Sequence, residues 1–254
     1  MLKRLLHSRL ALPSLCAVCR SWNTHAVCTS CLHQMGPVVR RCPSCALPLA
    51  PGLHLCAHCT EHGHSPLTQA RARVDYQWPW THLVQQWKFH QQSAWSTEWA
   101  RLMMQDASLV QTLQSAQVWI PIPLTPERLA ERGFNQSWEL IKRLHLHAPQ
   151  VRLLPHALLR HNTQRLQHQL SRAERLSHAQ HALSLNPEAV THLPGQRVML
   201  VDDVMTTGAT LYAAAQHLLD AGATQVSSVV LARTPQATTK LRPVSPRDEA
   251  MLLS

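Results

Sequence analysis

The stretch of residues 198–210 constrains the fold of this chain more than any other part of its sequence. It opens with four apolar residues, 198–201, and such a short unbroken apolar run is typical of a strand buried on both faces of a parallel sheet. Asp202 and Asp203 follow where we expect this strand to end. An Ala- and Leu-rich run, residues 211–221, has good helix propensity, so the sequence predicts a strand, a hydroxyl-rich turn and a helix.

The turn between the strand and the helix suits a phosphate monoester. It offers backbone N–H groups, threonine hydroxyls and the partial positive charge of a helix N-terminus. Its residues are Thr206, Thr207, Gly208, Ala209 and Thr210. The acid pair Asp202 and Asp203 would repel a phosphate, but two carboxylates can accept hydrogen bonds from the vicinal hydroxyls of a ribose or help to place Mg²⁺. A phosphate site beside a diol site predicts a ribose 5-phosphate ligand.

This stretch differs from two common nucleotide-binding loops and resembles a third. The chain contains neither Gly-x-x-x-x-Gly-Lys-Ser/Thr nor Gly-x-Gly-x-x-Gly. Residues 198–210 resemble the 5-phosphoribosyl-1-pyrophosphate (PRPP) loop of type I phosphoribosyltransferases. The resemblance implies that Asp202 and Asp203 contact the ribose hydroxyls and that residues 206–210 hold the 5-phosphate. An ordinary buried strand before a capped helix is the alternative, but a cap needs one Asp or Thr rather than two acids and three threonines.

All eight cysteines lie before residue 60 and form four Cys-x-x-Cys pairs. Two thiolates at this spacing chelate Zn²⁺, and two such pairs complete a tetrahedral site with no open position for a substrate. We therefore expect two structural zinc sites in which consecutive pairs join. The first would consist of Cys16, Cys19, Cys28 and Cys31, and the second of Cys42, Cys45, Cys56 and Cys59. An interleaved arrangement of the pairs stays open.

Other uses of the cysteines are weaker alternatives. A disulfide framework needs an oxidising compartment, and no export signal supports one. Redox Cys-x-x-Cys motifs are rarely repeated four times, whereas an iron–sulfur cluster stays open because thiolate spacing does not choose the metal. Four histidines near the last pair could replace a sulfur ligand, although solvated loop histidines are the simpler interpretation. They are His54, His58, His62 and His64.

The size and charge of the chain limit its class. A length of 254 residues accommodates one α/β domain with a sizeable core and a smaller module. The net charge of +10 favours phosphorylated or nucleic-acid partners. No apolar run approaches the roughly 20 residues of a membrane span. Residues 2–15 contain Lys3 and Arg4, but His7 and Arg9 interrupt their apolar stretch, so we expect an amphipathic helix rather than a signal peptide, and a soluble, cytoplasmic protein.

Two further segments carry candidate functional residues. Residues 76–90 contain tryptophans and Lys88, and Leu83, Val84 and Trp87 fall at helical spacing. Most of these aromatics are expected in the core, although basic residues interleaved with aromatics can also bind single-stranded nucleic acid. After the predicted strand 118–124, which stops at its prolines, Arg128 and Arg132 share one helical face and could grip a pyrophosphate. A surface helix whose glutamates pair with these arginines is the alternative.

Several motifs together resemble the ComF family of competence and DNA-utilisation proteins. They are Trp-Lys-Phe-His at 87–90, Arg-Gly-Phe-Asn-Gln at 132–136, Leu-Ser-Arg-Ala-Glu-Arg at 170–175, the PRPP loop and Leu-Ala-Arg-Thr at 231–234. Their order behind the cysteine pairs is more specific than any one of them. The resemblance implies a small double zinc ribbon at 1–65 and an α/β phosphoribosyltransferase-like parallel sheet flanked by helices at 66–234. Composition predicts a flexible tail at 235–254.

The family resemblance implies Mg²⁺-assisted displacement of pyrophosphate from C1 of PRPP. Asp202 and Asp203 would hold the ribose as candidate catalytic residues, and Arg128 or Arg132 would hold the pyrophosphate. No residue stands out as a group that recognises an acceptor base, so turnover stays open. The alternative function is a non-catalytic zinc-containing module that binds single-stranded DNA and uses the pocket as a sensor or docking site. Under both functions we expect the protein to act in DNA uptake and to associate with the DNA-uptake machinery.

Residues 160–175 are rich in Gln, His and Arg. They resemble the flexible loop that closes over the substrate in phosphoribosyltransferases and excludes water from the reactive ribosyl centre. A basic surface helix is an equally consistent interpretation.

Overall fold

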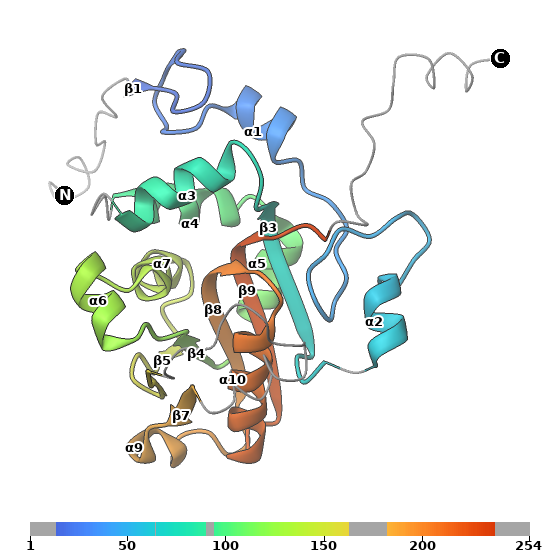
Figure 1. Ribbon diagram of the computed structural model, residues 1–254, viewed down its shortest axis with the longest axis vertical. Coiled ribbons are helices and arrows are strands. Elements are labelled where there is room, and N and C mark those ends of the chain that lie inside the picture. Colours follow the sequence, from blue (N-terminus) through green and yellow to red (C-terminus); the bar gives the residue numbers. More distant parts are fainter. Residues whose placement is uncertain (1–13, 64, 90–93, 163–181, 237–254) are drawn as a thin grey trace, which may run out of the picture.

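The computed structural model describes residues 14–63, 65–89, 94–162 and 182–236 (Figure 1). Three expectations therefore fall largely outside the described residues: the N-terminal helix over 2–15, the closing loop over 160–175 and the tail over 235–254. Residues 14 and 15 are described, and they form a strand rather than the end of a helix. This strand, β1 (Ser14–Leu15), pairs antiparallel with β2 (Trp22–Asn23).

A five-stranded parallel sheet forms the centre of the larger part of the chain. Its strand order is β3-β9-β8-β4-β5. The strands are β3 (Gln69–Asp75), β4 (Val118–Pro121), β5 (Arg152–Leu153), β8 (Arg197–Met205) and β9 (Gln225–Arg233). Every neighbouring pair in this sheet is parallel. Parallel strands need crossover connections, which place helices on the faces of the sheet, and the expected α/β class is confirmed.

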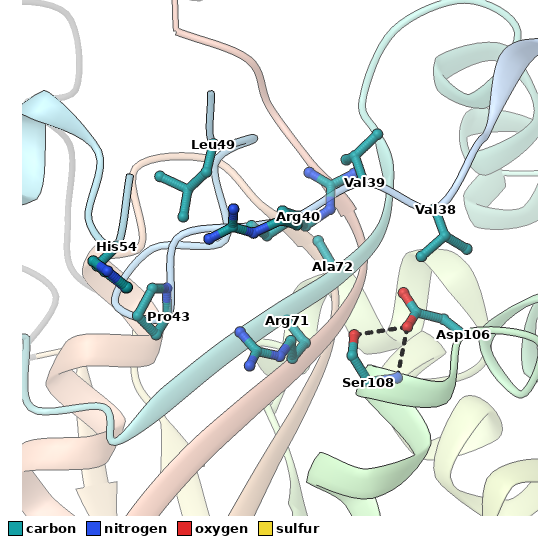
Figure 2. Close-up of a pocket in the computed structure, with 11 residues that line it drawn as sticks. Val38, Val39, Arg40, Pro43, Leu49, His54, Arg71, Ala72, Asp106 and Ser108 are labelled. Carbon is teal, nitrogen blue, oxygen red and sulfur yellow. Dashed lines mark hydrogen bonds between the residues drawn. The ribbon is translucent and has the colours of Figure 1, made fainter. Parts of the chain in front are cut away.

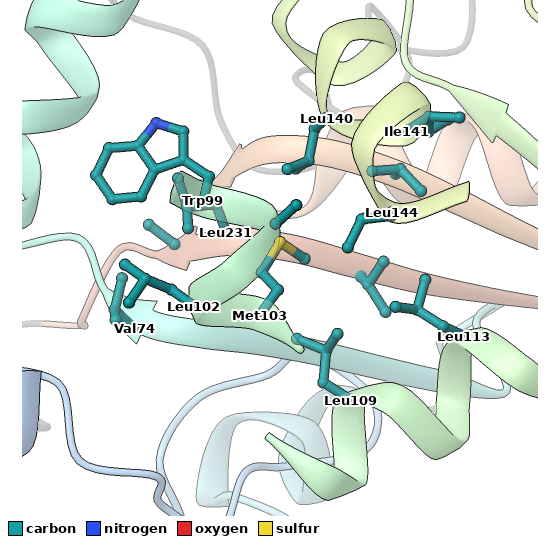
Figure 3. Close-up of a cluster of buried hydrophobic side chains, with 14 of the residues drawn as sticks. Val74, Trp99, Leu102, Met103, Leu109, Leu113, Leu140, Ile141, Leu144 and Leu231 are labelled. Atoms are coloured by element: carbon teal, nitrogen blue, oxygen red, sulfur yellow. The ribbon is translucent and has the colours of Figure 1, made fainter. Parts of the chain in front are cut away.

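Helices cover both faces of the sheet (Figure 1). One face is covered by α10 (Ala209–Asp220), and the other by α3 (Trp80–Phe89), α4 (Trp95–Met103), α5 (Ala107–Gln114) and α7 (Gln136–Leu144). The side chains of β8 alternate between the two cores. Val198 and Leu200 pack with α10. Met199 and Val201 pack with the other helices, in the core that Figure 3 shows around Trp99.

Shorter elements complete the fold. They are α6 (Pro126–Arg132), the 3₁₀ turn η1 (His145–His147), the antiparallel pair β6 (Leu158–Arg160) and β7 (Leu183–Leu185), and α9 (Pro187–Val190). The strand predicted over 118–124 ends at Pro121. One more bond follows, from the Ile122 N–H to the Val201 carbonyl at 3.0 Å. Pro123 has no N–H with which to extend the ladder.

The N-terminal region packs along the edge of the sheet and contains two short helices, α1 (Thr29–Met35) and α2 (Ala57–His62). The buried Arg73 of β3 donates to the Gly36 carbonyl at 2.7 Å, and the Ala70 N–H donates to the Pro43 carbonyl at 2.5 Å. These bonds dock the N-terminal region directly on the sheet. Within the described ranges, no helix has the length and apolar character needed to cross a membrane.

Candidate functional site

The central strand β8 carries the predicted acid pair near its carboxyl end. The strand runs on to Met205 instead of ending before Asp202, because Val204 and Met205 continue to pair with β9, so the predicted boundary was wrong. Hydrogen bonds fix the first carboxylate. Its Oδ1 accepts from Ser137 Oγ at 2.9 Å and from the Asp203 N–H at 2.9 Å. Helix α7 therefore orients Asp202 across the helix–sheet boundary.

Lys88, on α3, pairs with the second carboxylate. Its Nζ lies 2.9 Å from Asp203 Oδ2, and both side chains are largely buried. The pKa of Asp202 is raised to about 7, mainly by burial and then by the negative charge of Asp203. The hydrogen bond from Ser137 and the charge of Lys88 oppose this shift. At neutral pH the carboxyl group of Asp202 is therefore near the middle of its titration. Sequence analysis did not name Lys88 as a site residue, because it lies among aromatics expected in the core. The Trp-Lys-Phe-His motif at 87–90 was the feature that could have indicated its role.

The turn after β8 has backbone geometry that suits an anion. Gly208 has a φ of +87° and immediately precedes α10. A Cβ there would lie 2.6 Å from Met205 Cε and 2.8 Å from the Tyr212 ring, so this position requires glycine. Both Thr206 and Thr207 are exposed. The turn thus presents hydroxyls and the N-terminus of a twelve-residue helix at the carboxyl edge of the sheet.

Arg233 supports this turn, and sequence reasoning missed its role. The residue is buried at the end of β9 and donates to the carbonyl oxygens of Met205, at 3.1 Å, and of Thr206. Its Nε donates to the Cys45 carbonyl at 2.6 Å. A single guanidinium therefore joins the turn to the cysteine region. The Leu-Ala-Arg-Thr motif contained this residue, but nothing local in the sequence indicated its partners.

The two predicted pyrophosphate arginines lie one turn apart on α6 but differ in their surroundings. Arg128 is exposed on α6, whereas Arg132 is half-buried with its guanidinium 5.3 Å from the centre of the Phe89 ring. Arg160, on β6, is a third cation of this region. Burial is the main cause that lowers its pKa, and the charges of Asp202 and Arg128 also act on it. Arg160 thus lies near both Asp202 and Arg128, while Arg132 is engaged with an aromatic ring.

A mostly apolar cavity of about 710 Å³ lies beside these arginines. Its walls include Leu129, Phe134, Trp138, Leu159, Arg160 and His161. A hollow of this size and character could hold a flat organic group. Sequence reasoning found no such site, because its walls come from α6, α7 and β6, which are separate in the chain.

The eight cysteines, all of them described, form two groups of four. The ligand atoms of Cys16, Cys19, Cys28 and Cys31 lie within 4.8 Å of one another, as do those of Cys42, Cys45, Cys56 and Cys59. All eight are free thiols. The consecutive pairing is confirmed, and within the described residues neither group includes a histidine. Four sulfur donors around one point could hold a metal ion, and this donor set is consistent with zinc.

Comparison with known proteins gives one family model and several full-length relatives. A model described as "Phosphoribosyl transferase domain" matches residues 136–244. The "DNA utilization protein YhgH" of Salmonella typhimurium is 31% identical over 231 residues, which cover 89% of this chain and 99% of the relative. The "Competence protein ComFC" of Bacillus subtilis is 40% identical over 118 residues, covering 46% and 45% of the two chains. "Competence protein F" of Haemophilus influenzae is 32% identical over 61% of this chain and 68% of its own.

Proposed function

Because the chain belongs to the ComF family of competence and DNA-utilisation proteins, we propose that it binds PRPP, or a related ribose 5-phosphate, at the carboxyl end of β8. One observation carries the proposal. An acid pair, the half-buried Asp202 and the buried Asp203, lies shortly before a glycine-dependent turn at the start of a helix, inside the segment that matches the phosphoribosyltransferase model. A diol site beside an anion site fits the two ends of a ribose 5-phosphate.

In this proposal the residues of the chain orient the ribose and offset charge. Asp202 and Asp203 accept hydrogen bonds from the ribose hydroxyls, and the turn 206–210 donates to the 5-phosphate. Arg128 and Arg132 bind the pyrophosphate, which requires Arg132 to leave the Phe89 ring. Mg²⁺ bound together with PRPP would offset the charge of the pyrophosphate. Displacement at C1 would then depend on positioning and on stabilising a ribosyl cation rather than on acid–base chemistry.

The cavity beside Trp138 is the proposed place for an acceptor. It is lined mostly by apolar side chains, while Arg160 belongs both to its wall and to the surroundings of Asp202. A planar base bound there would lie next to the ribose, as a transfer reaction needs. The chain is thus a possible phosphoribosyltransferase whose acceptor class would be a heteroaromatic base.

The proposal also covers the domain organisation of the chain and its location in the cell. The two cysteine groups hold structural zinc within a double zinc ribbon over residues 1–65, which precedes a phosphoribosyltransferase-like domain over 66–234 and a tail over 235–254. A cytoplasmic location and an association with the DNA-uptake machinery are also part of the proposal, and the words "DNA utilization" and "Competence" in the names of the relatives support a role in DNA handling. Zinc-site stoichiometry, measured by metal analysis of the purified chain, should be two per chain.

Calorimetric titration of the metal-loaded protein with PRPP and Mg²⁺ tests the proposal. The Asp202→Asn/Asp203→Asn variant should lose binding, because each substitution replaces one accepting carboxylate oxygen by an NH₂ donor and removes the negative charge. A variant that removes two exposed acids elsewhere, Glu188→Gln/Asp220→Asn, is matched in charge and should bind like the wild type. Absence of PRPP binding by folded wild-type protein would overturn the proposal.

The second candidate function, a non-catalytic module that binds single-stranded DNA, is favoured by the net charge of +10 and by Trp22, which is 75% exposed on the first cysteine region. Exposed aromatics and positive charge are the features that bind single strands without sequence preference. The same Asp202→Asn/Asp203→Asn variant separates the two functions. It should lose PRPP binding if the first function holds, and it should keep wild-type, salt-dependent DNA binding if the second holds.

A further inference from the structure

A second cavity, of about 410 Å³, lies between the cysteine region and the edge strand β3 (Figure 2). Its walls come from residues 38–43, from Leu49 and His54, from the Arg71 and Ala72 part of β3, and from Asp106 with Ser108 at the start of α5. In the sheet, β9 lies between β3 and β8. This cavity is therefore distinct from the candidate ribose-phosphate site, and we call it the arginine pocket.

Three guanidinium groups and one imidazole line the arginine pocket, against one carboxylate. The groups are those of Arg40, Arg41, Arg71 and His54, and the carboxylate is that of Asp106. Arg41 already has partners, because its Nη1 lies 2.7 Å from Asp75 Oδ1 and donates to the Ala46 carbonyl at 3.1 Å. Arg40 is exposed and donates from Nη2 to the Leu53 carbonyl at 3.0 Å, which leaves its charge unneutralised.

Arg71 is the least satisfied of these cations. Its Nε is fully buried and has no hydrogen-bond partner in the described part of the chain, and its Nη1 has a long contact of 3.4 Å with the Ala70 carbonyl. Figure 2 shows its guanidinium in the space between Pro43 and Ser108. Burying a charged donor without a partner is unfavourable, so an anion that entered the pocket would recover a hydrogen bond that the protein alone does not make.

The carboxylate in the wall does not already fill this role. Asp106 Oδ1 accepts from the Ser108 N–H at 2.9 Å, from Ser108 Oγ at 2.7 Å and from the Leu109 N–H at 3.2 Å. Asp106 is thus the N-cap of α5. No salt bridge joins it to Arg71 among the residues that the structure describes.

We propose that the arginine pocket binds the phosphate group of a nucleotide, with Arg71 and Arg40 as its charge partners. Guanidinium groups bind phosphate oxygens through paired hydrogen bonds. The apolar residues of the same wall, Val38, Val39 and Leu49, offer a surface for the sugar or base. The phosphate can belong to a free mononucleotide or to the backbone of a single strand, which share this chemistry. The site is independent of the PRPP proposal.

Fluorescence anisotropy with a labelled oligo-dT strand, and calorimetry with dTMP, test this site on the full metal-loaded chain. The Arg40→Gln/Arg71→Gln variant should weaken binding of at least one probe by about tenfold or more, and should lower the salt slope by about one for each phosphate that the protein no longer neutralises. Arg152→Gln and Arg20→Gln are exposed substitutions that remove the same charge elsewhere, and together they serve as the control. Loss of dTMP binding identifies a mononucleotide site, and loss confined to the strand identifies a site for the strand backbone.

A second variant keeps the test valid if the half-buried Arg71 is needed for folding. Val39 is 36% exposed at the wall, so Val39→Glu places an acid at the pocket without changing Arg71. It should weaken phosphate binding, whereas Val39→Gln should not. Equal binding by all pocket and control variants, or no binding of either probe by the wild type, overturns the proposal. PRPP titration of the same variants shows whether the ribose-phosphate site is intact.

Discussion

The two four-cysteine groups have nearly the same sequence pattern but different structural surroundings. The first group contacts the helical layer, where the Val27 N–H donates to Glu98 Oε1 at 3.1 Å and Arg101 pairs with the same carboxylate at 2.6 Å. The second group contacts the candidate phosphate turn. Its Cys45 carbonyl accepts from Arg233, and the Tyr212 hydroxyl of α10 donates to the carbonyl of the residue before Cys45 at 3.2 Å.

The difference shows that the same cysteine motif can support two different parts of one domain. Metal at the first group would stabilise the packing of α4. Metal at the second would hold the segment that Arg233 and Tyr212 use to fix the turn after β8. Ligand affinity should therefore depend on the second group far more than on the first, although both contribute to folding.

Replacing one buried cysteine in each group should give the largest effect. Cys16 and Cys42 are both fully buried, so Cys16→Ser and Cys42→Ser are matched substitutions. Each should lose one metal per chain and lower the thermal midpoint. Cys42→Ser should also weaken PRPP binding by about tenfold or more, while Cys16→Ser should change it by less than about threefold, because structural zinc orders the segment it binds. Metal analysis, thermal unfolding and PRPP titration measure these effects, and equal PRPP affinities in the two variants would contradict the comparison.

Arg233→Met removes the link between the second group and the turn without removing a metal ligand. We expect a loss of about 2–4 kcal/mol in the free energy of unfolding, since several buried carbonyl oxygens lose a charged donor. PRPP affinity should fall as well. Urea denaturation and calorimetry measure the two losses. Arg197→Met, an exposed arginine at the start of β8, is the control, and a similar response from it would show that the link is unimportant.

Glu98→Gln is the equivalent substitution for the first group. Glu98 is buried and accepts bonds from Val27 and Arg101, so its neutralisation should cost about 1–2 kcal/mol of folding free energy. PRPP affinity should stay unchanged, because these contacts lie in the helical layer. Urea denaturation and PRPP titration check both statements. A clear loss of PRPP affinity here would show that the first group, too, is coupled to the turn.

The smallest expected effect is a pH dependence confined to the ribose-phosphate site. The folded pKa of Asp202 is about 7, above its ordinary value of 3.8. Its contribution to stability is therefore fully present below pH 3.8 and is lost as the pH rises through 7. If the carboxylate form binds the ribose, PRPP affinity should rise about threefold between pH 6.5 and 7.5. Calorimetry at the two pH values measures this change.

Two controls bear on the pH prediction. Asp202→Asn should flatten the stability slope between pH 4 and 7, since that residue no longer titrates. Cys16→Ser should keep the slope, because the first cysteine group lies away from the acid pair. A slope that persists in Asp202→Asn would assign the titration to another group.

Local sequence features predicted the parts of the site that are continuous in the chain. The apolar run 198–201, the acid pair and the glycine turn were visible because a strand, a turn and a helix each depend on neighbouring residues. The consecutive grouping of the cysteines was predicted for the same reason. The end of β8 was misplaced because its last pairs depend on Ala232 and Arg233 of another strand rather than on its own polarity.

Contacts between distant segments could not be predicted in this way. Lys88 was visible as a basic residue among aromatics, but its partner Asp203 lies on a strand far along the chain. Arg233 was visible only as part of the Leu-Ala-Arg-Thr motif, and only the folded chain brings Cys45 and Thr206 to it. The arginine pocket likewise requires β3, α5 and the segment 38–43 to meet. Such sites depend on tertiary packing, which local propensity and spacing do not encode.

The docking of the cysteine region on β3 also protects the protein from self-association. β3 is the outer strand of the sheet, and its free side is met by Pro43, whose carbonyl accepts from the Ala70 N–H. An uncovered edge strand offers unpaired N–H and C=O groups to other chains. A metal at the second cysteine group would thus also guard the edge of the sheet, and metal shortage would appear as aggregation in addition to weaker ligand binding.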